Sequence, residues 1–520
     1  MLKNLRVAVS IPVFGLLTFY FLDFADLLPA GIGALGRIQF VPALLSANIV
    51  IIACLIICAL LFGRVYCSFI CPMGIFQDIV SRLSRAMRSA TLRRGTNRGT
   101  NGKGFLPGKK YAYRKNNPAL RWSIVVAGLV LFFAGATMAA GILDPYSAYG
   151  RMAVHLFKPA YMFANNILVP VLENFGNYTL YKTQIAVLSG FSLGVALLTF
   201  MVVSVLAWTK GRLYCNTVCP VGTILGFVNK FSLFKIRLNS GECVSCGICA
   251  AMCKASCIDA KAKSVDYSRC VNCFNCINSC NKKAISFAMK NKPAKPGKPA
   301  ASFDKGRREF LLLMLGAAAA HKVFAQSISF NVSDRRGIAI SPPGSVSADR
   351  LLRHCTSCHL CISKCPSKVL KPSFMEYGLA GMMIPMVHYE RGFCNYDCTV
   401  CAGVCPSHAL LPLTKEQKHR LQIGRVAFTP EICVVYTNGT SCGACSEHCP
   451  TQAVTMVPYK DGLTIPFINA DICVGCGACE YICPVRPQRA IHVEGNEIHR
   501  EAKAFTVEKG EEKEITDFGF

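Results

Sequence analysis

Most of the 31 cysteines in this 520-residue chain stand in short runs of four. Within a run, about two, two and three residues separate successive cysteines, and thiolates at this spacing hold [4Fe–4S] clusters. Disulfide frameworks scatter their cysteines along the chain instead, so cluster ligation is favoured over cross-linking. Such clusters carry single electrons, which makes electron transfer the first chemistry to consider.

The first two runs lie between residues 243 and 280 and have the spacing of a two-cluster ferredoxin. In that arrangement three cysteines of one run and the fourth of the other hold each cluster. The proline that usually follows the fourth cysteine is missing, since Lys254 and Asn281 stand in its place, and Cys257 is left over as a small core residue. The predicted ligand sets are Cys243, Cys246, Cys249 and Cys280, and Cys270, Cys273, Cys276 and Cys253.

Four more runs lie in residues 326–500, and each is followed by a proline. Two depart from the strict spacing, by one extra residue before Cys398 and by eight residues before Cys442, which loops can absorb. Crossing between consecutive runs predicts four clusters here and six in the chain, although nesting of the outer and inner runs remains an alternative. The crossed sets are Cys355, Cys358, Cys361 and Cys405; Cys394, Cys398, Cys401 and Cys365; Cys433, Cys442, Cys445 and Cys483; and Cys473, Cys476, Cys479 and Cys449.

One of these runs also spells a c-type haem attachment site, Cys355-x2-Cys358-His359. A haem there would leave Cys361 and Cys365 without a role, whereas the cluster interpretation uses all four cysteines and the following proline. Haem is therefore the less favoured cofactor. A zinc-ribbon interpretation of the runs fails for the same reason.

A different cysteine motif occurs twice, in residues 63–74 and 211–222. The two copies share Gly, Arg, Tyr, two Cys, Pro and a final Gly, and each follows an apolar stretch. Two helix-pair repeats, 1–80 and 120–228, related by a pseudo-twofold axis would bring the four thiols together. The set Cys67, Cys71, Cys215 and Cys219 could then hold a further cluster or a metal, or form a redox-active disulfide.

The elements that position these motifs include apolar stretches long enough to cross a membrane. Uncharged stretches of 22, 22 and 25 residues predict transmembrane helices at 41–62, 122–143 and 185–209, and the shorter stretch 7–22 is a marginal fourth. The loop 64–121 contains 13 Lys or Arg and one acidic residue, Asp78, whereas 144–184 is nearly balanced. The positive-inside rule therefore places the N-terminus and residues 230–290 in the cytoplasm.

The net charge of +28 is confined to residues 1–325, since residues 326–520 contain 19 basic and 19 acidic residues. Beside apolar spans, this excess marks cytoplasmic loops rather than nucleic-acid binding. The boundary falls at 305–325, where Arg307 and Arg308 precede a short apolar run, as in a twin-arginine export signal or a fifth membrane anchor. Either would export the domain that follows, whereas an amphipathic helix, the less favoured alternative, would leave that domain in the cytoplasm.

The predicted fold is an α-helical membrane domain of four transmembrane helices in two repeats, with a possible fifth, joined to α+β ferredoxin-like modules. The predicted segments are a membrane domain (1–229), a cytoplasmic two-cluster module (230–290), a linker (291–304), the signal or anchor (305–325), a periplasmic four-cluster domain (326–500) and a polar tail (501–520).

With these motifs, residues 1–290 resemble the NapH-type membrane protein of periplasmic nitrate reductase systems, and residues 305–500 resemble its NapG-type partner. The resemblance implies a bacterial inner-membrane protein that oxidises quinol and passes electrons to other electron-transfer subunits or a periplasmic reductase. The chain would then be a quinol dehydrogenase-like component rather than a terminal reductase. Asp144 and His155, just beyond the third predicted helix, are candidate quinone ligands.

Two other functions fit the same motifs. In an assembly or maintenance factor, the membrane-surface cysteines would reduce or hold a metal for a partner metalloenzyme. A redox sensor would need an output domain, and the sequence contains none that can be recognised.

Overall fold

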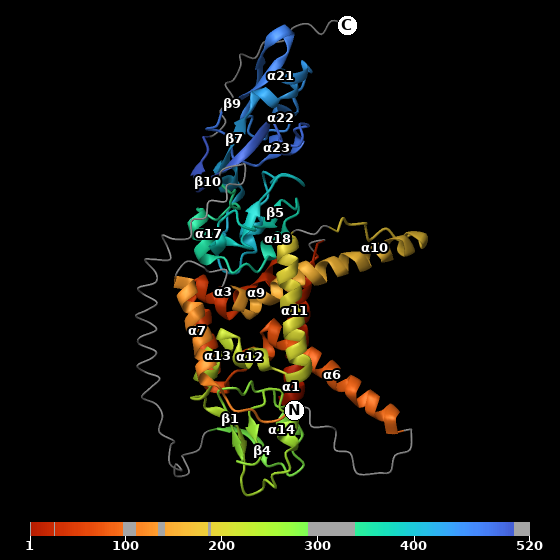
Figure 1. Ribbon diagram of the computed structural model, residues 1–520, viewed down its shortest axis with the longest axis vertical. Coiled ribbons are helices and arrows are strands. Elements are labelled where there is room, and N and C mark those ends of the chain that lie inside the picture. The colour runs from red at the N-terminus through yellow and green to blue at the C-terminus, as the bar shows by residue number, and fades with distance from the viewer. Residues whose placement is uncertain are drawn as a thin grey trace.

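The computed structural model describes six stretches of the chain, residues 2–24, 27–96, 111–133, 141–185, 189–289 and 338–503. The predicted linker 291–304, the arginine-pair segment 305–325 and most of the polar tail 501–520 lie outside the described residues. The described parts form an elongated molecule. A helical body lies between a small cysteine-rich module at one end and a longer cysteine-rich domain at the other (Figure 1).

Two helices in the described ranges are long and apolar enough to cross a membrane, α1 (Leu2–Leu22) and α11 (Gly190–Lys210). The stretch 7–22 was expected to be marginal, yet α1 extends it to 21 residues. Arg6 can lie inside this helix because it is 1% exposed and pairs with Asp78 at 2.6 Å. A charged residue that is neutralised by a partner does not end a helix.

The other two predicted spans differ from the structure. The stretch 41–62 divides into α3 (Phe40–Leu45) and α4 (Ile49–Phe62), because Ala47 adopts a positive φ of 52° and the Asn48 side chain caps α4. The stretch 122–143 begins in α7 (Pro118–Phe133), and residues 134–140 lie outside the description. The prediction of four spanning helices is therefore met by two in the described residues, with α4 and α7 as shorter apolar helices.

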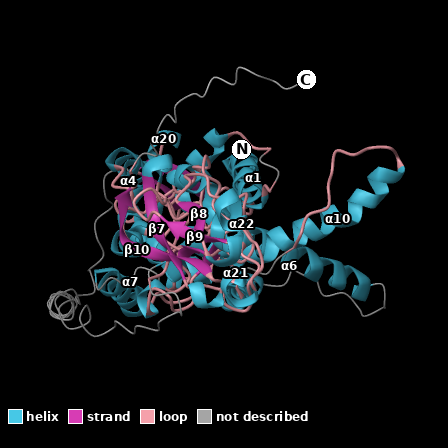
Figure 2. Ribbon diagram, turned by 90° about the horizontal axis from the view of Figure 1, so that it is seen from above, coloured by secondary structure: helices cyan, strands magenta, loops and turns pink. Residues whose placement is uncertain are grey.

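Two further helices project sideways from the body, α6 (Pro72–Thr96) and α10 (Lys158–Asn174). In Figure 1 they leave the body at different heights along α11, with α6 toward the small module and α10 toward the long domain. The view from above shows both pointing away from the body (Figure 2). Short helices complete the body: α2 (Ala34–Arg37), α5 (Tyr66–Phe69), α9 (Pro145–Met152), a π-helical turn (Ala153–Phe157), α12 (Leu213–Thr217) and α13 (Pro220–Asn229).

The small module, residues 234–289, is built from two antiparallel strand pairs. Strand β1 (Phe234–Leu238) pairs with β4 (Ile285–Met289), and the short strands β2 (Ile258–Asp259) and β3 (Ser264–Val265) pair with each other. The helices α14 (Ile248–Met252) and α15 (Asn275–Asn278) each begin within a cysteine run. Two strand pairs and two short helices give the predicted ferredoxin-like arrangement.

The long domain, residues 338–503, combines three antiparallel strand pairs with short helices (Figure 1). Its antiparallel pairs are β5 (Leu370–Pro372) with β6 (Pro385–Val387), β7 (Leu421–Phe428) with β10 (Ile491–Glu501), and β8 (Val454–Pro458) with β9 (Thr464–Ile468). Its helices are short, and cysteines make up a large part of its buried core. They are α17 (Ala348–His354), α18 (Leu360–Lys364), α19 (Val400–Gly403), α20 (Lys415–Arg420), α21 (Val434–Asn438), α22 (Ala444–Glu447) and α23 (Ala478–Ile482).

Candidate iron–sulfur sites

The four runs with strict spacing share one backbone conformation. In each, the residues directly before and after the second cysteine have a positive φ, such as Ser357 and His359 around Cys358. Two left-handed residues curl the chain into a loop and turn backbone N–H groups inward, as in the anion-binding loops of other sites. The Ser357 N–H accordingly lies 3.4 Å from the Cys355 sulfur, and the Gly475 N–H makes the same contact with Cys473.

In the small module the two runs exchange their fourth cysteines. One small cavity is lined by Cys270, Cys273, Cys276 and Cys253, together with the spare Cys257. Burial raises the pKa of Cys249, and the neighbouring thiols of Cys246, Cys243 and Cys280 add to the effect. The structure therefore brings together both predicted sets. Cys257 lies 3.5 Å from the Cys253 sulfur, so one set has a fifth thiol beside it.

The long domain also brings together cysteines from consecutive runs. Burial raises the pKa of Cys361, and the thiols of Cys355, Cys358 and Cys405 raise it further. Burial and the neighbouring thiols of Cys394, Cys365 and Cys398 raise the pKa of Cys401 in the same way. Two more cavities are each lined by one crossed set, Cys433, Cys442, Cys445 and Cys483, and Cys449, Cys473, Cys476 and Cys479. The nested arrangement is not the one that the fold assembles.

The chemistry of these sets fits an iron–sulfur core. Burial raises the pKa of Cys445 and of Cys476 to about 12, and adjacent thiols contribute, so four thiolates cannot share such a site without a cationic group. In the described residues, no three His, Cys, Asp or Glu side chains converge on a single metal ion. Thiols spread around a small cavity suit a polynuclear cluster instead, because its four ligands bind different iron atoms.

The repeated motif of the helical body also gathers its four cysteines. Cys67, Cys71, Cys215 and Cys219 are each 3–4% exposed and belong to one core, and we call them the cysteine quartet. Burial raises the pKa of Cys219, and Cys215, Cys71 and Cys67 raise it further, which places all four thiols close together.

The two motif copies share the same close internal contact. A Cβ added to Gly74 would lie 2.2 Å from the carbonyl oxygen of Cys67, and one added to Gly222 would lie 2.1 Å from that of Cys215. Each final glycine of the motif is therefore fixed by the same close approach of the chain to its own first cysteine. This contact explains why both copies end in glycine.

The motif arginines cross between the copies. Arg64 Nη2 donates to the Cys215 carbonyl at 3.2 Å, and Arg212 Nη1 donates to the Cys67 carbonyl at 2.6 Å. Arg64 Nη2 also lies 3.8 Å from the Cys67 sulfur, and Gln77 Nε2 lies 3.2 Å from the Cys215 sulfur. Two fully buried guanidinium groups beside four thiols favour negative charge on sulfur, as metal or cluster ligation requires.

A buried carboxylate connects the quartet to the N-terminal helix and the small module. Asp78 accepts from Arg212 at 2.8 Å and from Arg6 at 2.6 Å, and lies 3.2 Å from Lys254 Nζ. Burial alone would raise the pKa of Asp78, but the three cations hold it well below its usual value. Lys254 stands where the ferredoxin pattern expects proline, so this ion cluster gives that departure a structural reason.

The motif copies that hold the quartet are in direct contact with the small module. Ser68, next to Cys67, donates to the Val271 carbonyl at 2.6 Å, and Arg64 Nη1 donates to the Ser268 carbonyl at 3.2 Å. The Arg212 N–H donates to the Lys254 carbonyl at 2.9 Å. The loop that carries Cys270 and Cys273 therefore packs against these motif copies.

The opposite end of the helical body holds the first run of the long domain. Arg151 Nη1 donates to the Ser357 carbonyl at 3.1 Å, and the His155 and His359 rings share a hydrogen bond of 2.8 Å. A Cβ on Gly150 would lie 2.6 Å from the Cys358 carbonyl, so α9 lies directly against this loop.

Buried tyrosines and Asp144 occupy the space between the quartet and this first run. Burial raises the pKa of Tyr214 well above its usual value, and the neighbouring Cys219, Cys215 and Asp144 raise it further. Burial likewise raises the pKa of Tyr146 well above its usual value, and the neighbouring Cys358 and Asp144 raise it further. Asp144 therefore lies near both the quartet side and the Cys358 side.

The structure places the two candidate quinone ligands inside the protein. Asp144 is 2% exposed, caps α9 and accepts from the Ser147 N–H and Oγ. Burial and Arg151 lower the pKa of His155 to about 4, and its Nε2 is bonded to His359. His359 uses its other ring nitrogen on the Met383 carbonyl, so both of its nitrogens are engaged within the protein.

Sequence reasoning found the cysteines but gave no role to their charged partners. The repeated arginines were visible only as matching letters, and Asp78 only as the single acidic residue in a basic loop. The position of Asp78 as the single acidic residue of that loop was the sign of its role that the sequence offered. A lone carboxylate among 13 cations is expected to be paired.

The comparisons with known proteins agree with this arrangement. A family described as "4Fe-4S binding domain" matches residues 46–89 and 191–239, which contain both copies of the repeated motif. Families described as "4Fe-4S dicluster domain" match residues 266–369 and 440–486. No solved structure matches the chain.

Three curated proteins are similar to parts of the chain. The ferredoxin-type protein NapF of Escherichia coli is 31% identical over 147 residues, which is 28% of this chain and 80% of NapF. The ferredoxin-type protein NapG of the same species is 26% identical, over 36% of this chain and 86% of NapG. The methylamine utilization ferredoxin-type protein MauM of Methylorubrum extorquens is 32% identical, over 30% of this chain and 72% of MauM. The chain therefore belongs to the ferredoxin-type iron–sulfur electron-transfer proteins of the NapF, NapG and MauM kind.

Proposed function

We propose that this chain is a membrane-integrated conduit that carries single electrons between the quinol pool and a periplasmic acceptor. The observation that carries the proposal is the position of the cysteine quartet. The motif that holds it packs against the loop of Cys270 and Cys273 on one side, and buried tyrosines and Asp144 lie between it and the loop of Cys358 on the other. Within the described residues, candidate iron–sulfur ligands therefore occur in the small module, the helical body and the long domain.

The six crossed cysteine sets each hold one [4Fe–4S] cluster in this proposal, and the quartet holds a seventh redox centre. These groups supply one-electron carriers, and the protein supplies their ligands and surroundings. Arg64 lies 3.8 Å from the Cys67 sulfur, and the charges of Arg212 and Arg64 both favour the thiolate of Cys215. The hydrogen bonds from Ser357 and Gly475 to cysteine sulfur act in the same sense in the long domain.

The helices and the charge distribution support a place in the bacterial inner membrane. Helices α1 and α11 are long enough to span, and α10 exposes Phe163, Ile167 and Leu168 on one face by 51–60%. A sideways helix with an exposed apolar face suits the membrane surface, where its polar face stays in water. The basic helix α6 would lie at the cytoplasmic surface and α10 at the periplasmic one, with the small module inside and the long domain outside.

The burial of the quartet argues against an assembly factor that hands metal to a partner enzyme. Ligand exchange needs thiols that a partner can reach, and these are 3–4% exposed under two arginines. An internal electron carrier has no such need. The chain is then a quinol dehydrogenase-like component that works with other redox subunits.

Transmembrane electron flow tests the proposal. The full chain, loaded with clusters, is placed in lipid vesicles that enclose ferricyanide, and dithionite is added outside. We expect the enclosed ferricyanide to be reduced by wild type and by a Cys54→Ala control, whose thiol is exposed on α4 and outside every motif. Cys67→Ala should slow the reduction at least tenfold, with the iron of the other six sites retained. Equal rates for Cys67→Ala and wild type would refute the conduit.

A further inference from the structure

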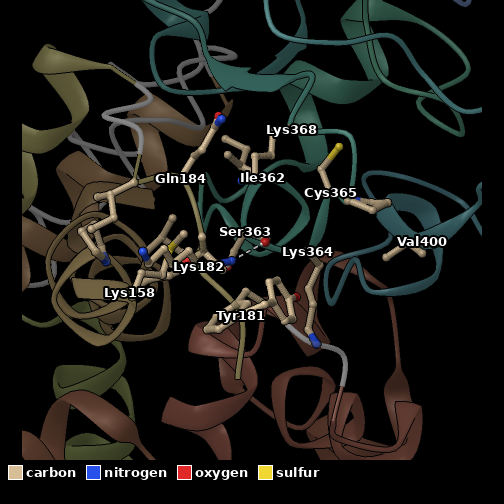
Figure 3. A pocket seen from close by; sticks show the side chains of 17 residues that line it. Lys158, Tyr181, Lys182, Gln184, Ile362, Ser363, Lys364, Cys365, Lys368 and Val400 are labelled. Carbon is tan, nitrogen blue, oxygen red and sulfur yellow. Dashed lines mark hydrogen bonds between the residues drawn. The ribbon is translucent and has the colours of Figure 1, made fainter. Parts of the chain in front are cut away.

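A cavity of about 660 Å³ lies where α10, the segment 181–185 and the long domain meet. Its walls come from Phe24, from α10 and the π-helical turn before it, and from the segment 181–185. The long domain contributes residues between 362 and 368, at the end of its own first cysteine run. Figure 3 shows Lys158, Ser363 and Cys365 around the same space. A space of this volume is in the range that holds a small-molecule ligand.

The cavity is built by specific contacts. Asn166 Nδ2 donates to the Thr183 carbonyl at 2.8 Å, and the Thr183 N–H donates back to Asn166 Oδ1 at 2.9 Å. Asn165 donates to the Tyr181 carbonyl at 3.0 Å. Two neighbouring asparagines of α10 therefore fix the segment 181–185 as a wall.

The lining combines apolar surface with hydrogen-bond donors and contains no carboxylate. Val154, Met162 and Ile362 supply apolar walls, while Lys158 donates to the Ser363 carbonyl at 2.5 Å and to its hydroxyl at 2.8 Å. An ammonium group has three N–H donors, so these two bonds leave one for a ligand oxygen. Such a lining suits a flat, apolar molecule with carbonyl or hydroxyl oxygens at its edge.

The position of the cavity selects a redox-active ligand that comes from lipid. Cys365, a predicted cluster ligand, forms part of the wall. On the other side, α10 begins at the cavity with Lys158, Pro159 and Met162 and continues outward with exposed Phe163 and Ile167. Its apolar face offers a track for an apolar tail, and the partly exposed Tyr181 and Ile185 leave the site open to the surface.

We propose that this cavity binds the head group of a quinol or quinone, with Lys158 bonded to a ring oxygen and the tail along α10. The proposal rests on the electron-transfer function above and gives it an entry point. A hydroquinone oxidised here loses two electrons and two protons and becomes the quinone. The electrons go singly to the iron–sulfur groups of the chain, and the protons go to water at the open side.

Binding of 2-heptyl-4-hydroxyquinoline N-oxide, a fluorescent quinol analogue, tests the site without electron transfer. Met162 lines the cavity and is 7% exposed, so Met162→Trp should fill it and weaken binding at least tenfold. Met201 is 60% exposed on α11 and outside the lining, so Met201→Trp should change binding less than twofold. Quenching of the analogue's fluorescence on the full chain in lipid nanodiscs measures both. Equal binding by Met162→Trp and wild type would overturn the proposal.

A second measurement needs no variant. An azido-quinone photolabel on wild type should mark peptides that contain residues 158–185 or 362–368, and labelling only elsewhere would exclude the site. If dioleoylphosphatidylglycerol displaced the analogue stoichiometrically in detergent, the cavity would be a lipid headgroup site instead. The dithionite-driven flux across vesicles does not use quinol, so it should be unchanged in Met162→Trp. A failure of quinol binding is thereby separated from a failure of the conduit.

Discussion

Replacing Asp78 by asparagine should weaken the attachment of the small module to the helical body. Asp78 is 6% exposed and compensates three buried cations, Arg6, Arg212 and Lys254, at 2.6–3.2 Å. These cations belong to the N-terminal helix, the second motif copy and the small module. Asparagine keeps the shape of the side chain but removes its charge, so three cations would remain buried beside one neutral amide.

Removing one partner of a buried ion pair costs about 3–5 kcal/mol, because it leaves an uncompensated buried charge. In a unit of about 150–250 residues, each kcal/mol lowers the melting temperature by about 2–4 °C, so Asp78→Asn should lower it by about 6–20 °C. The wild-type pKa of Asp78 lies well below its usual value. The stabilisation is therefore complete at neutral pH and is lost only as the pH falls below about 4, through the lowered pKa.

Melting can be followed by the visible absorbance of the iron–sulfur clusters, with the full chain in nanodiscs at pH 7.5. Asp349→Asn is the matched control, since Asp349 pairs with Arg353 at 2.9 Å but both side chains are more than 65% exposed. An exposed pair of this kind is worth about 0–1 kcal/mol, so the control should melt near wild type. If Asp78→Asn melts within 2 °C of wild type, the argument from the buried ion cluster is wrong.

Two further changes probe other parts of the structure. Gly222→Ala would place a Cβ 2.1 Å from the Cys215 carbonyl, so this variant should lose any metal bound by the quartet. Gly194→Ala is the control, because a Cβ there has nothing within 4 Å and metal content should not change. Iron analysis measures both variants, and full iron in Gly222→Ala would contradict the packing argument. Burial lowers the pKa of His499 to about 4, only partly offset by its bond to Ser341, so the unfolded chain takes up this proton first. The stability of the long domain should then fall as the pH drops from 6.5 toward 4, and His499→Gln should flatten that fall in melts at pH 7.5 and 5.5; identical slopes would exclude His499 as the cause.

The cysteine sets could be predicted from sequence because their geometry is largely local. A run such as Cys473 to Cys479 needs only two left-handed residues, Gly475 and Gly477, to curl around its site. The exchange of the fourth cysteine follows from joining two such loops through short strand pairs. Spacing alone left crossed and nested pairing open among the last four runs, and the structure groups Cys361 with the thiols of Cys355, Cys358 and Cys405, as crossed pairing expects.

The helices were predicted less well, because charged residues were taken to mark the ends of the membrane-spanning stretches. Arg6 would have been excluded from a span by its type, yet its bond to Asp78, 72 residues away, lets α1 run through it. The stretch 41–62 looked continuous because its break at Ala47 and Asn48 involves no charged residue and no proline. A break made by one positive φ in an apolar stretch leaves almost no trace in sequence.

The sequence by itself determined the cofactor chemistry and the repeat, and it predicted the ligand sets, because ligand type and spacing act within a few residues. Only the tertiary structure decided what lies between those sets. In the folded protein, Arg64 and Arg212 each bind the opposite motif copy, and Asp78 lies beside three cations. A cavity also forms between α10 and the first run of the long domain. Each of these features joins residues more than 70 positions apart, and no local pattern encodes such a contact.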